Sequence, residues 1–479
     1  MGSADQGAQL GGRAPQGVRL SPAPHRHRSL GRILLVPTIN GARHISVVIP
    51  AQAGMTEIDK PAASHASAIV GASPPRQFSR PDSSPIVILS HQRCGGDMQD
   101  GLPLQSLLHR QMACRPLTSE FYTSADVFAA DLEFIHYRRW QFVAHACAVP
   151  TPGDYLTWTI GSHSIIVVRG QDGAVRAFHN VCRHRGSRIC AEESGKVRRL
   201  VCPYHRWTYD LDGRLITAVE REFGVPREEL GLKPVALRDV AGLLFISLAA
   251  APPDFEPAAR LLAPQLVRHG FAHAKVAHRI DYLVKANWKL VFENNRECYH
   301  CAAHHPEYVA ATYDVQRDEA VVDPRRATEV DAVIDEAAKR FEAIGLGPAG
   351  LSSDMSGSYF RCNRTPLMAG FATESLDGKP VAPLMGDLPG FDTGTLRTTV
   401  FPNFWQHANA DHAVAARLTP LAPDLTHVAG SWIVHKDAVE GRDYSLDRLL
   451  PVWDRTNRQD WALCEAQQQG ASSPAYEPG

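Results

Sequence analysis

The sequence lacks a large excess of charge of either sign and lacks any long apolar run. Lys and Arg total 50 against 51 Asp and Glu among 479 residues, a formal net charge of −1. This balance gives no electrostatic reason to expect a nucleic acid or a membrane surface as a partner. The longest apolar stretches, such as Ile33 to Pro37 and Ile45 to Pro50, are too short to cross a bilayer. A ligand must therefore be recognised at a local site.

Disulfide frameworks and leader patterns are missing as well. Ten cysteines are too few for a disulfide scaffold in a chain of this length, and four of them (Cys182, Cys202, Cys298, Cys301) lie close to histidines. That placement is typical of metal binding in a reducing compartment. The start, Met-Gly-Ser-Ala-Asp, has no basic region followed by an apolar run, so no secretory signal is predicted. We expect a cytoplasmic location.

Residues 1–103 show no sustained period of 2 or 3.6. They are rich in Pro, Gly, Ser, Ala, Arg and His, which predicts a disordered extension. A start codon assigned too far upstream would give the same composition without periodicity. In that case Met98 and Met112 are candidate starts.

Organised sequence begins at about residue 104 and predicts an α+β protein. In 104–138, Ser124 is a candidate N-cap in front of helically spaced apolar residues. Region 139–250 consists of short β-rich runs broken by turn signals, which predicts a small antiparallel β domain. Region 251–479 alternates longer helical patterns with strands such as 428–435, which predicts a larger α+β domain.

The first metal pattern lies in the predicted β domain. It reads Cys182-Arg-His184, then 17 residues, then Cys202-Pro-Tyr-His205. Two thiolates and two imidazoles can hold one [2Fe–2S] cluster, and the imidazoles raise its reduction potential. The alternative is a Cys2His2 zinc site with the same ligand types. Zinc sites more often pair Cys with Cys and His with His, so the mixed pairs favour the cluster.

The second pattern contains Glu297, His300, His304, His305 and Pro306. Two histidines and one carboxylate form the facial triad of non-haem iron enzymes, which leaves open positions for O2 and substrate. Plain helical spacing favours His304 as the partner of His300. Pro306 disfavours helical geometry at His305, so a helix end there would turn His305 toward the metal instead.

A carboxylate ligand must come from elsewhere, and residues 446–465 read as one helix. Asp460 falls on the helix face that carries Trp453, Thr456, Leu463 and Cys464. A buried carboxylate needs a partner, which is either an arginine or a metal.

Together these patterns resemble the large (alpha) subunits of Rieske non-haem iron oxygenases, from about residue 105 to the C-terminus. The resemblance implies a Rieske [2Fe–2S] domain inserted beside a larger helix-grip catalytic domain with an antiparallel sheet. It implies cluster binding by Cys182, His184, Cys202 and His205. For a mononuclear Fe(II) it implies His300, His305 and Asp460, because the family's second histidine follows the first by five residues and precedes a proline.

The resemblance also gives Glu297 a role in catalysis, next to the metal ligands. In the family, the acid three residues before the first iron histidine bridges the two metal centres of neighbouring subunits. Glu297 would then connect His205 of one subunit to His300 of the next, which implies a homotrimer. A capping or surface glutamate is the alternative.

The likeness is closest to the branch that demethylates betaines, in segments 293–301, 375–386 and 434–441. It implies that O2 and electrons from a separate NAD(P)H-dependent flavin and iron–sulfur reductase hydroxylate an N-methyl group of glycine betaine or proline betaine, releasing formaldehyde. The chain itself carries no nucleotide-binding motif. An aromatic-ring hydroxylating dioxygenase and a Rieske electron carrier are the alternatives.

A quaternary ammonium ion has no N–H, so aromatic faces must recognise it. Candidates, each also explained by core packing, are Tyr359, Phe360, Phe371, Phe404 and Trp405. Two features depart from the family: residues 1–103 have no counterpart, and relatives continue beyond the present C-terminus, so we expect a shortened catalytic domain.

Overall fold

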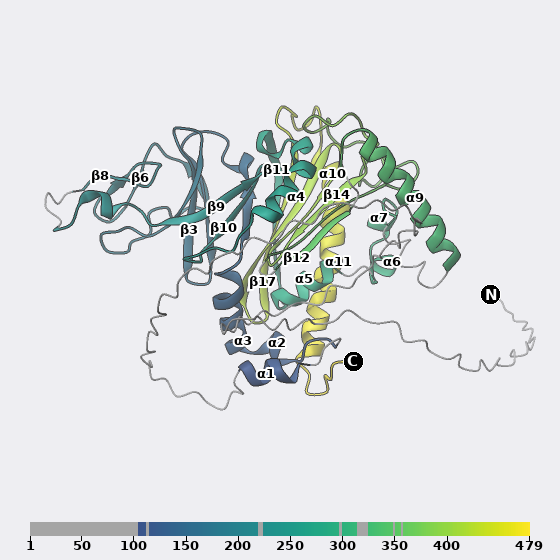
Figure 1. Cartoon of the computed structure of the whole chain (residues 1–479), viewed down its shortest axis with the longest axis horizontal. Coiled ribbons are helices and arrows are strands. Elements are labelled where there is room, and N and C mark those ends of the chain that lie inside the picture. Colours follow the sequence, from purple (N-terminus) through teal and green to yellow (C-terminus); the bar gives the residue numbers. More distant parts are fainter. Residues whose placement is uncertain are drawn as a thin grey trace, which may run out of the picture.

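The computed structural model describes residues 104–111, 115–218, 224–296, 299–313, 324–347, 350–355 and 358–479. The extension predicted for 1–103 and the side chain of Glu297 lie outside these residues. Figure 1 shows a β-rich part at one end of the molecule and a larger α+β part at the other. The predicted α+β class with antiparallel sheets is confirmed.

The β-rich part contains a seven-stranded antiparallel sheet in the order β1-β10-β9-β4-β3-β2-β5. Its strands are β1 (Gln141–His145), β2 (Asp154–Ile160), β3 (His163–Arg169), β4 (Val175–His179), β5 (Ser194–Lys196), β9 (Pro234–Val240) and β10 (Leu243–Ser247). The β-branched run Ile165 to Val168 in β3 is completely buried, because apolar clusters cover both faces of the sheet. A smaller sheet joins β6 (Leu200–Val201), β7 (Thr208–Tyr209) and β8 (Leu215–Thr217).

The larger part is organised around a second seven-stranded antiparallel sheet, in the order β11-β17-β16-β15-β14-β13-β12. Its strands are β11 (Ala274–Val284), β12 (Gly350–Met355), β13 (Ser358–Thr365), β14 (Thr395–Val400), β15 (Phe404–Ala408), β16 (His412–Ala422) and β17 (Leu425–His435). The strand predicted for 428–435 is therefore confirmed as part of β17.

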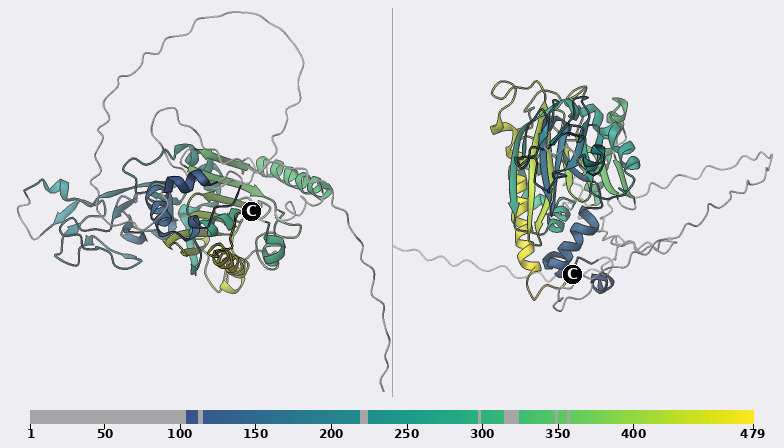
Figure 2. Two further views of the ribbon diagram at one scale, coloured as in Figure 1. Left: turned by 90° about the horizontal axis from the view of Figure 1, so that it is seen from below. Right: turned by 90° about the vertical axis from the view of Figure 1, so that its left-hand side faces the viewer.

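Helices cover this sheet. They are α4 (Glu256–Leu266), α5 (Trp288–Arg296), α6 (Cys301–His304), α7 (Pro306–Val309), α9 (Pro324–Ala343), α10 (Leu446–Leu449) and α11 (Pro451–Ala471). The prediction of one helix over 446–465 is wrong in part, because Pro451 starts a new helix after α10. Proline suits the first turn of a helix, where its missing N–H has no intrahelical partner. Figure 2 shows α11, in yellow, running alongside the sheet.

Three short helices precede the β-rich part: α1 (Leu104–Arg110), α2 (Glu120–Thr123) and α3 (Ala125–Asp131). Ser124 caps α3 as predicted, accepting a hydrogen bond from the Val127 N–H at 3.4 Å. The three helices share an apolar cluster with α5 and α11. The Tyr476 hydroxyl also donates to the Leu117 carbonyl at 2.9 Å. Segments from both ends of the described chain therefore stabilise the larger part.

Hydrogen bonds fix the β-rich part against the second sheet. The Asn403 side chain accepts from the Phe142 N–H and donates to the Phe142 carbonyl, both at 2.9 Å. His145 Nε2 lies 2.7 Å from Gln406 Oε1. None of the described helices is long and apolar enough to span a bilayer.

Candidate metal sites

Two short loops with the same backbone geometry carry the first group of metal-binding side chains. The Gly186 N–H donates to the Cys182 carbonyl at 3.0 Å, and the Arg206 N–H donates to the Cys202 carbonyl at 3.1 Å. Gly186 and Arg206, each four residues after its cysteine, have left-handed φ angles of 77° and 61°. Each loop therefore closes tightly and places its cysteine and histidine on the same side.

The four side chains predicted to bind the cluster come together. The Cys182 and Cys202 thiols are in hydrogen-bond contact, and the His184 and His205 rings are centred 4.7 Å apart. His205 Nδ1 is buried with no hydrogen-bond partner among the described residues. Two thiols in contact and two neighbouring imidazoles, one of them with an unpartnered buried nitrogen, are the donor types that a [2Fe–2S] cluster requires.

Two aromatic residues, Trp207 and Tyr209, support these loops. The Tyr209 hydroxyl lies 3.3 Å from Cys182 Sγ and accepts a hydrogen bond from the Arg183 N–H at 3.0 Å. The Trp207 ring stacks on His184 at 5.0 Å. Burial raises the pKa of the Cys182 thiol, so metal binding by this side chain requires the loss of its proton.

The second group converges on one carboxylate oxygen. Asp460 Oδ1, from α11, lies 3.0 Å from His300 Nε2 and 2.9 Å from His305 Nε2. His305 is 1% exposed, and its Nε2 approaches Asp460 without hydrogen-bond geometry. Two imidazole nitrogens and a carboxylate oxygen arranged in this way fit a divalent iron with open coordination positions.

His305, and not His304, faces Asp460. Helix α6 ends at His304, and His305 has φ −123° and ψ 65° before Pro306 starts α7. His304 is exposed, and its Nδ1 lies 3.0 Å from the His300 carbonyl. The helix end predicted from Pro306 is therefore confirmed, and the plain i, i+4 pairing does not describe this backbone.

An outer partner orients His305. The Gln459 side-chain oxygen lies 2.8 Å from His305 Nδ1, which leaves Nε2 directed toward Asp460. Such a partner on the far nitrogen fixes the tautomer and orientation of a metal-binding imidazole. On His300, Asn294 Nδ2 lies 3.4 Å from Nε2, the same nitrogen that faces Asp460. No spacing rule predicted Gln459 or Asn294, because both contacts depend on how α5 and α11 pack.

The electrostatics keep Asp460 ionised. Burial works to raise the pKa of Asp460, but its contacts with His300 and His305 outweigh burial, and the pKa is lowered. For His305, burial works in the opposite direction, yet the contact with Asp460 raises its pKa. A carboxylate anion between two imidazoles is ready to bind a cation.

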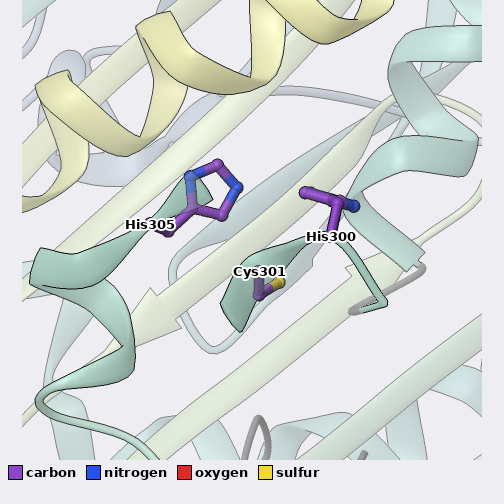
Figure 3. A group of neighbouring side chains, drawn as sticks. All are labelled: His300, Cys301 and His305. Carbon is purple, nitrogen blue, oxygen red and sulfur yellow. The ribbon is translucent and has the colours of Figure 1, made fainter. Parts of the chain in front are cut away.

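A sulfur atom also approaches the site. The thiol of buried Cys301 and one ring nitrogen from each of His300 and His305 all lie within 4.8 Å of one another. Figure 3 shows these three side chains, from the start of α6 and the break before α7. The spacing put Cys301 next to His300 in the chain, but it gave no reason for the sulfur to lie near both imidazoles.

Known proteins share both parts of the chain. Residues 139–223 match the family described as "Rieske [2Fe-2S] domain", and residues 271–479 match "Ring hydroxylating alpha subunit (catalytic domain)". The chain is 42% identical over 377 residues to the glycine betaine monooxygenase oxygenase subunit of Chromohalobacter salexigens, covering 78% of this chain and 83% of that protein. It is 26% identical over 373 residues to the chloroplastic choline monooxygenase of Spinacia oleracea, covering 75% and 73%.

Solved structures share the fold. A quaternary ammonium Rieske monooxygenase in complex with L-carnitine matches with a TM-score of 0.54 and 23% identity, over 76% of this chain and 88% of that one. Naphthalene 1,2-dioxygenase from Rhodococcus sp. bound to indole matches with a TM-score of 0.55 and 23% identity, over 74% and 82%.

Proposed function

Because the chain belongs to the Rieske non-haem iron oxygenases, we propose that it hydroxylates an N-methyl group of a small quaternary ammonium betaine. The chain is an oxygenase whose family uses a [2Fe–2S] cluster and a mononuclear iron. Hydroxylation gives a hemiaminal, which collapses to formaldehyde and the demethylated amine. Glycine betaine and proline betaine are the candidate substrates. The observation that carries this proposal is the 42% identity to a glycine betaine monooxygenase subunit over most of both chains.

We assign the iron to His300, His305 and Asp460. When bound there, the iron supplies the activation of O2. The chain's own contribution is to hold the three donors in place: Gln459 orients His305, and α11 holds Asp460 against both imidazoles. This donor set consists of two imidazoles and one carboxylate, and it leaves coordination positions open for further ligands.

We assign the [2Fe–2S] cluster to Cys182, His184, Cys202 and His205. A separate NAD(P)H-dependent flavin and iron–sulfur reductase would supply its electrons, in keeping with the names of the relatives, which are oxygenase subunits. None of the seven described cysteines forms a disulfide with another described residue. Thiolate ligands and reductase supply both suit the cytoplasm, which we propose as the location.

We also propose a homotrimer in which Glu297 links the cluster of one subunit to the iron of the next. Strand β6, beside the cluster loops, and helix α6, beside the iron site, lie at opposite ends of the molecule in Figure 1. Electron transfer between two sites in one chain would have to cross that length. A neighbouring subunit that brings its own cluster loops to α6 removes this difficulty.

Formaldehyde release tests the activity. The purified chain, reduced by a compatible reductase, is given glycine betaine, proline betaine, L-carnitine, choline and naphthalene in parallel. We expect formaldehyde from at least one betaine and no hydroxylated product from naphthalene, with Asp460→Asn as the inactive control. Naphthalene oxidation without formaldehyde from any methylammonium compound would contradict the proposal and support the arene dioxygenase alternative.

A further inference from the structure

Three aromatic side chains form a wall beside the iron site. Tyr308 follows His305 by three residues, and Trp453 precedes Asp460 by about two helical turns. The Tyr308 and Trp453 rings are centred 5.4 Å apart, and His407 of β15 lies 4.3 Å from Trp453 and 5.9 Å from Tyr308. This wall therefore stands on the side of the sheet that faces α11.

A buried carboxylate lies behind the wall. Glu374 is 2% exposed and contacts three groups: His407 Nδ1 at 3.2 Å, Asn409 Nδ2 at 3.2 Å and Trp453 Nε1 at 3.0 Å. Burial works to raise the pKa of Glu374, but these neighbours outweigh it and lower the pKa. Burial also lowers the pKa of His407. The wall thus carries one negative charge next to a neutral imidazole.

A guanidinium lies at the other side of the same wall. Arg397 in β14 is the direct cross-strand neighbour of His407, so both side chains project from one face of the sheet. The Arg397 guanidinium carbon is 5.7 Å from the Tyr308 ring centre, and its Nε and Nη2 atoms are shielded from solvent. The wall therefore combines a cation and an anion on either side of Tyr308 and His407.

The two faces of the sheet differ in how completely they are filled. On the opposite face, Phe360, Leu396, Val400 and Phe404 are at most 1% exposed. On the α11-facing side of the same strands, Arg397 and Thr399 are only half-buried. Two of the aromatic residues suggested by the sequence, Phe360 and Phe404, therefore belong to the core, and the less completely covered face of these strands is the one that carries Arg397.

We infer that this wall is the recognition site for a zwitterion: Arg397 binds the substrate carboxylate, while Tyr308 and Trp453, with Glu374 behind them, hold the trimethylammonium group near the iron. This inference rests on the proposed function and names its specificity residues. Arginine binds carboxylates through two parallel hydrogen bonds, and aromatic faces attract quaternary ammonium ions. Two covalent bonds separate the nitrogen of glycine betaine from its carboxyl carbon, so one small wall must recognise both charges.

Binding of two probes by the full iron-loaded chain tests the inference. Glycine betaine carries both charges, whereas choline carries the same trimethylammonium head without a carboxylate. Isothermal titration without O2 gives a Kd for each. For Arg397→Met we expect the glycine betaine Kd to rise about 10- to 100-fold, the usual cost of losing charge-assisted hydrogen bonds. The choline Kd should stay within about 3-fold, because choline makes no use of a carboxylate partner.

Matched variants separate recognition from damage to the fold. Arg238→Met removes an exposed arginine from strand β9 of the β-rich part and should leave both Kd values unchanged. Arg397→Lys keeps the charge but loses the planar fork, so its glycine betaine Kd should lie between those of wild type and Arg397→Met. Tyr308→Leu should weaken both probes by a similar factor, because both carry the ammonium head. Thermal unfolding of each variant verifies that it is folded.

The outcomes distinguish this inference from the proposed function. Equal losses for both probes in Arg397→Met, or no loss for glycine betaine, would overturn the assignment of Arg397. Unchanged binding of both probes in Tyr308→Leu would overturn the aromatic part. If wild type releases formaldehyde from betaines in either case, the proposed function stands and only the wall is wrong. If wild type releases none from any betaine, the proposed function itself fails.

Discussion

The two candidate metal sites of this chain are built in different ways. The cluster loops lie close together in sequence, and each is shaped by its own backbone through a left-handed residue four positions after the cysteine. The iron site instead joins a broken helix at His300 and His305 to Asp460, which lies 160 residues after His300. The first site is therefore a local structure, whereas the second exists only when α11 packs on the sheet and on α5.

This difference explains which residues the sequence predicted. Cys182, His184, Cys202 and His205 follow from spacing, because short loops constrain where their side chains can lie. Asp460 followed from a helical face together with resemblance, and His305 from Pro306 together with the family spacing. Gln459, Asn294 and Cys301 approach the iron site through tertiary packing, for which a sequence pattern contains no signal.

For the fold, too, the sequence predicted local features but not contacts between distant segments. Antiparallel strands and their turns were predictable, since glycines such as Gly173, between β3 and β4, and Gly213, between β7 and β8, occupy the left-handed positions that turns require. The strand order was not, because it depends on contacts between distant segments. The recognition wall was also missed: Tyr308, His407 and Arg397 come from three separate elements, and only the register of β14 and β15 makes two of them neighbours.

Removing one predicted ligand from each site should have the largest effect on metal content, and each variant should lose only its own metal. We expect Asp460→Asn to lose the mononuclear iron and keep the cluster, and Cys182→Ser to lose the cluster signal. Activity of Asp460→Asn should fall by more than the roughly 10- to 100-fold cost of losing an outer-shell partner. Iron counts and the visible absorbance of the cluster check this. Asp454→Asn, at a half-buried carboxylate that pairs with Arg458 on the same helix, is the control and should retain both metals.

The adjacent histidines provide the next test. His305→Ala should lose most of the mononuclear iron, since it removes a buried donor that faces Asp460. His304→Ala should change iron content by less than about twofold, because an exposed side chain that contacts only its own turn contributes little. Iron retention after dialysis is the measurement. The reverse order of effects would show that the backbone break does not select the ligand.

The pH dependence of the metal-free protein gives a smaller effect. The lowered pKa of Asp460 contributes stability above the unfolded carboxyl value, about 3.9, and that contribution is lost as pH falls through the folded value. The raised pKa of His305 contributes stability that is complete below about 6.5 and is lost as pH rises through the folded value. The Asp460–His305 contact should therefore stabilise the metal-free chain most between these limits.

Thermal unfolding after mild chelation measures this effect. The Tm difference between wild type and Asp460→Asn should be larger at pH 6 than at pH 8. Iron binding should show the opposite trend and weaken toward pH 6, because protons compete with the metal for imidazole. An equal Tm difference at both values would mean that the two side chains do not interact in solution.

The smallest effects concern the paired cluster loops. Gly186→Ala should destabilise the chain by about 1–2 kcal/mol, because a Cβ at φ 77° is strained even though no atom within 4 Å opposes it. Arg206→Gly should relieve a similar strain at φ 61° and raise stability by up to about 1 kcal/mol. Denaturant unfolding of the cluster-loaded chain compares them. If both substitutions changed the free energy of unfolding in the same direction, the two loops would not be equivalent.

The break in front of Pro306 has a further consequence for how such sites change. Two neighbouring histidines are present, and the end of helix α6 decides which of them faces Asp460. Each residue turns an α-helix by about 100°, so a helix continued through this point would present a different imidazole to Asp460. Pro306 thus determines which histidine faces Asp460. Substitution of Pro306 would change that histidine although both imidazoles remain in the chain.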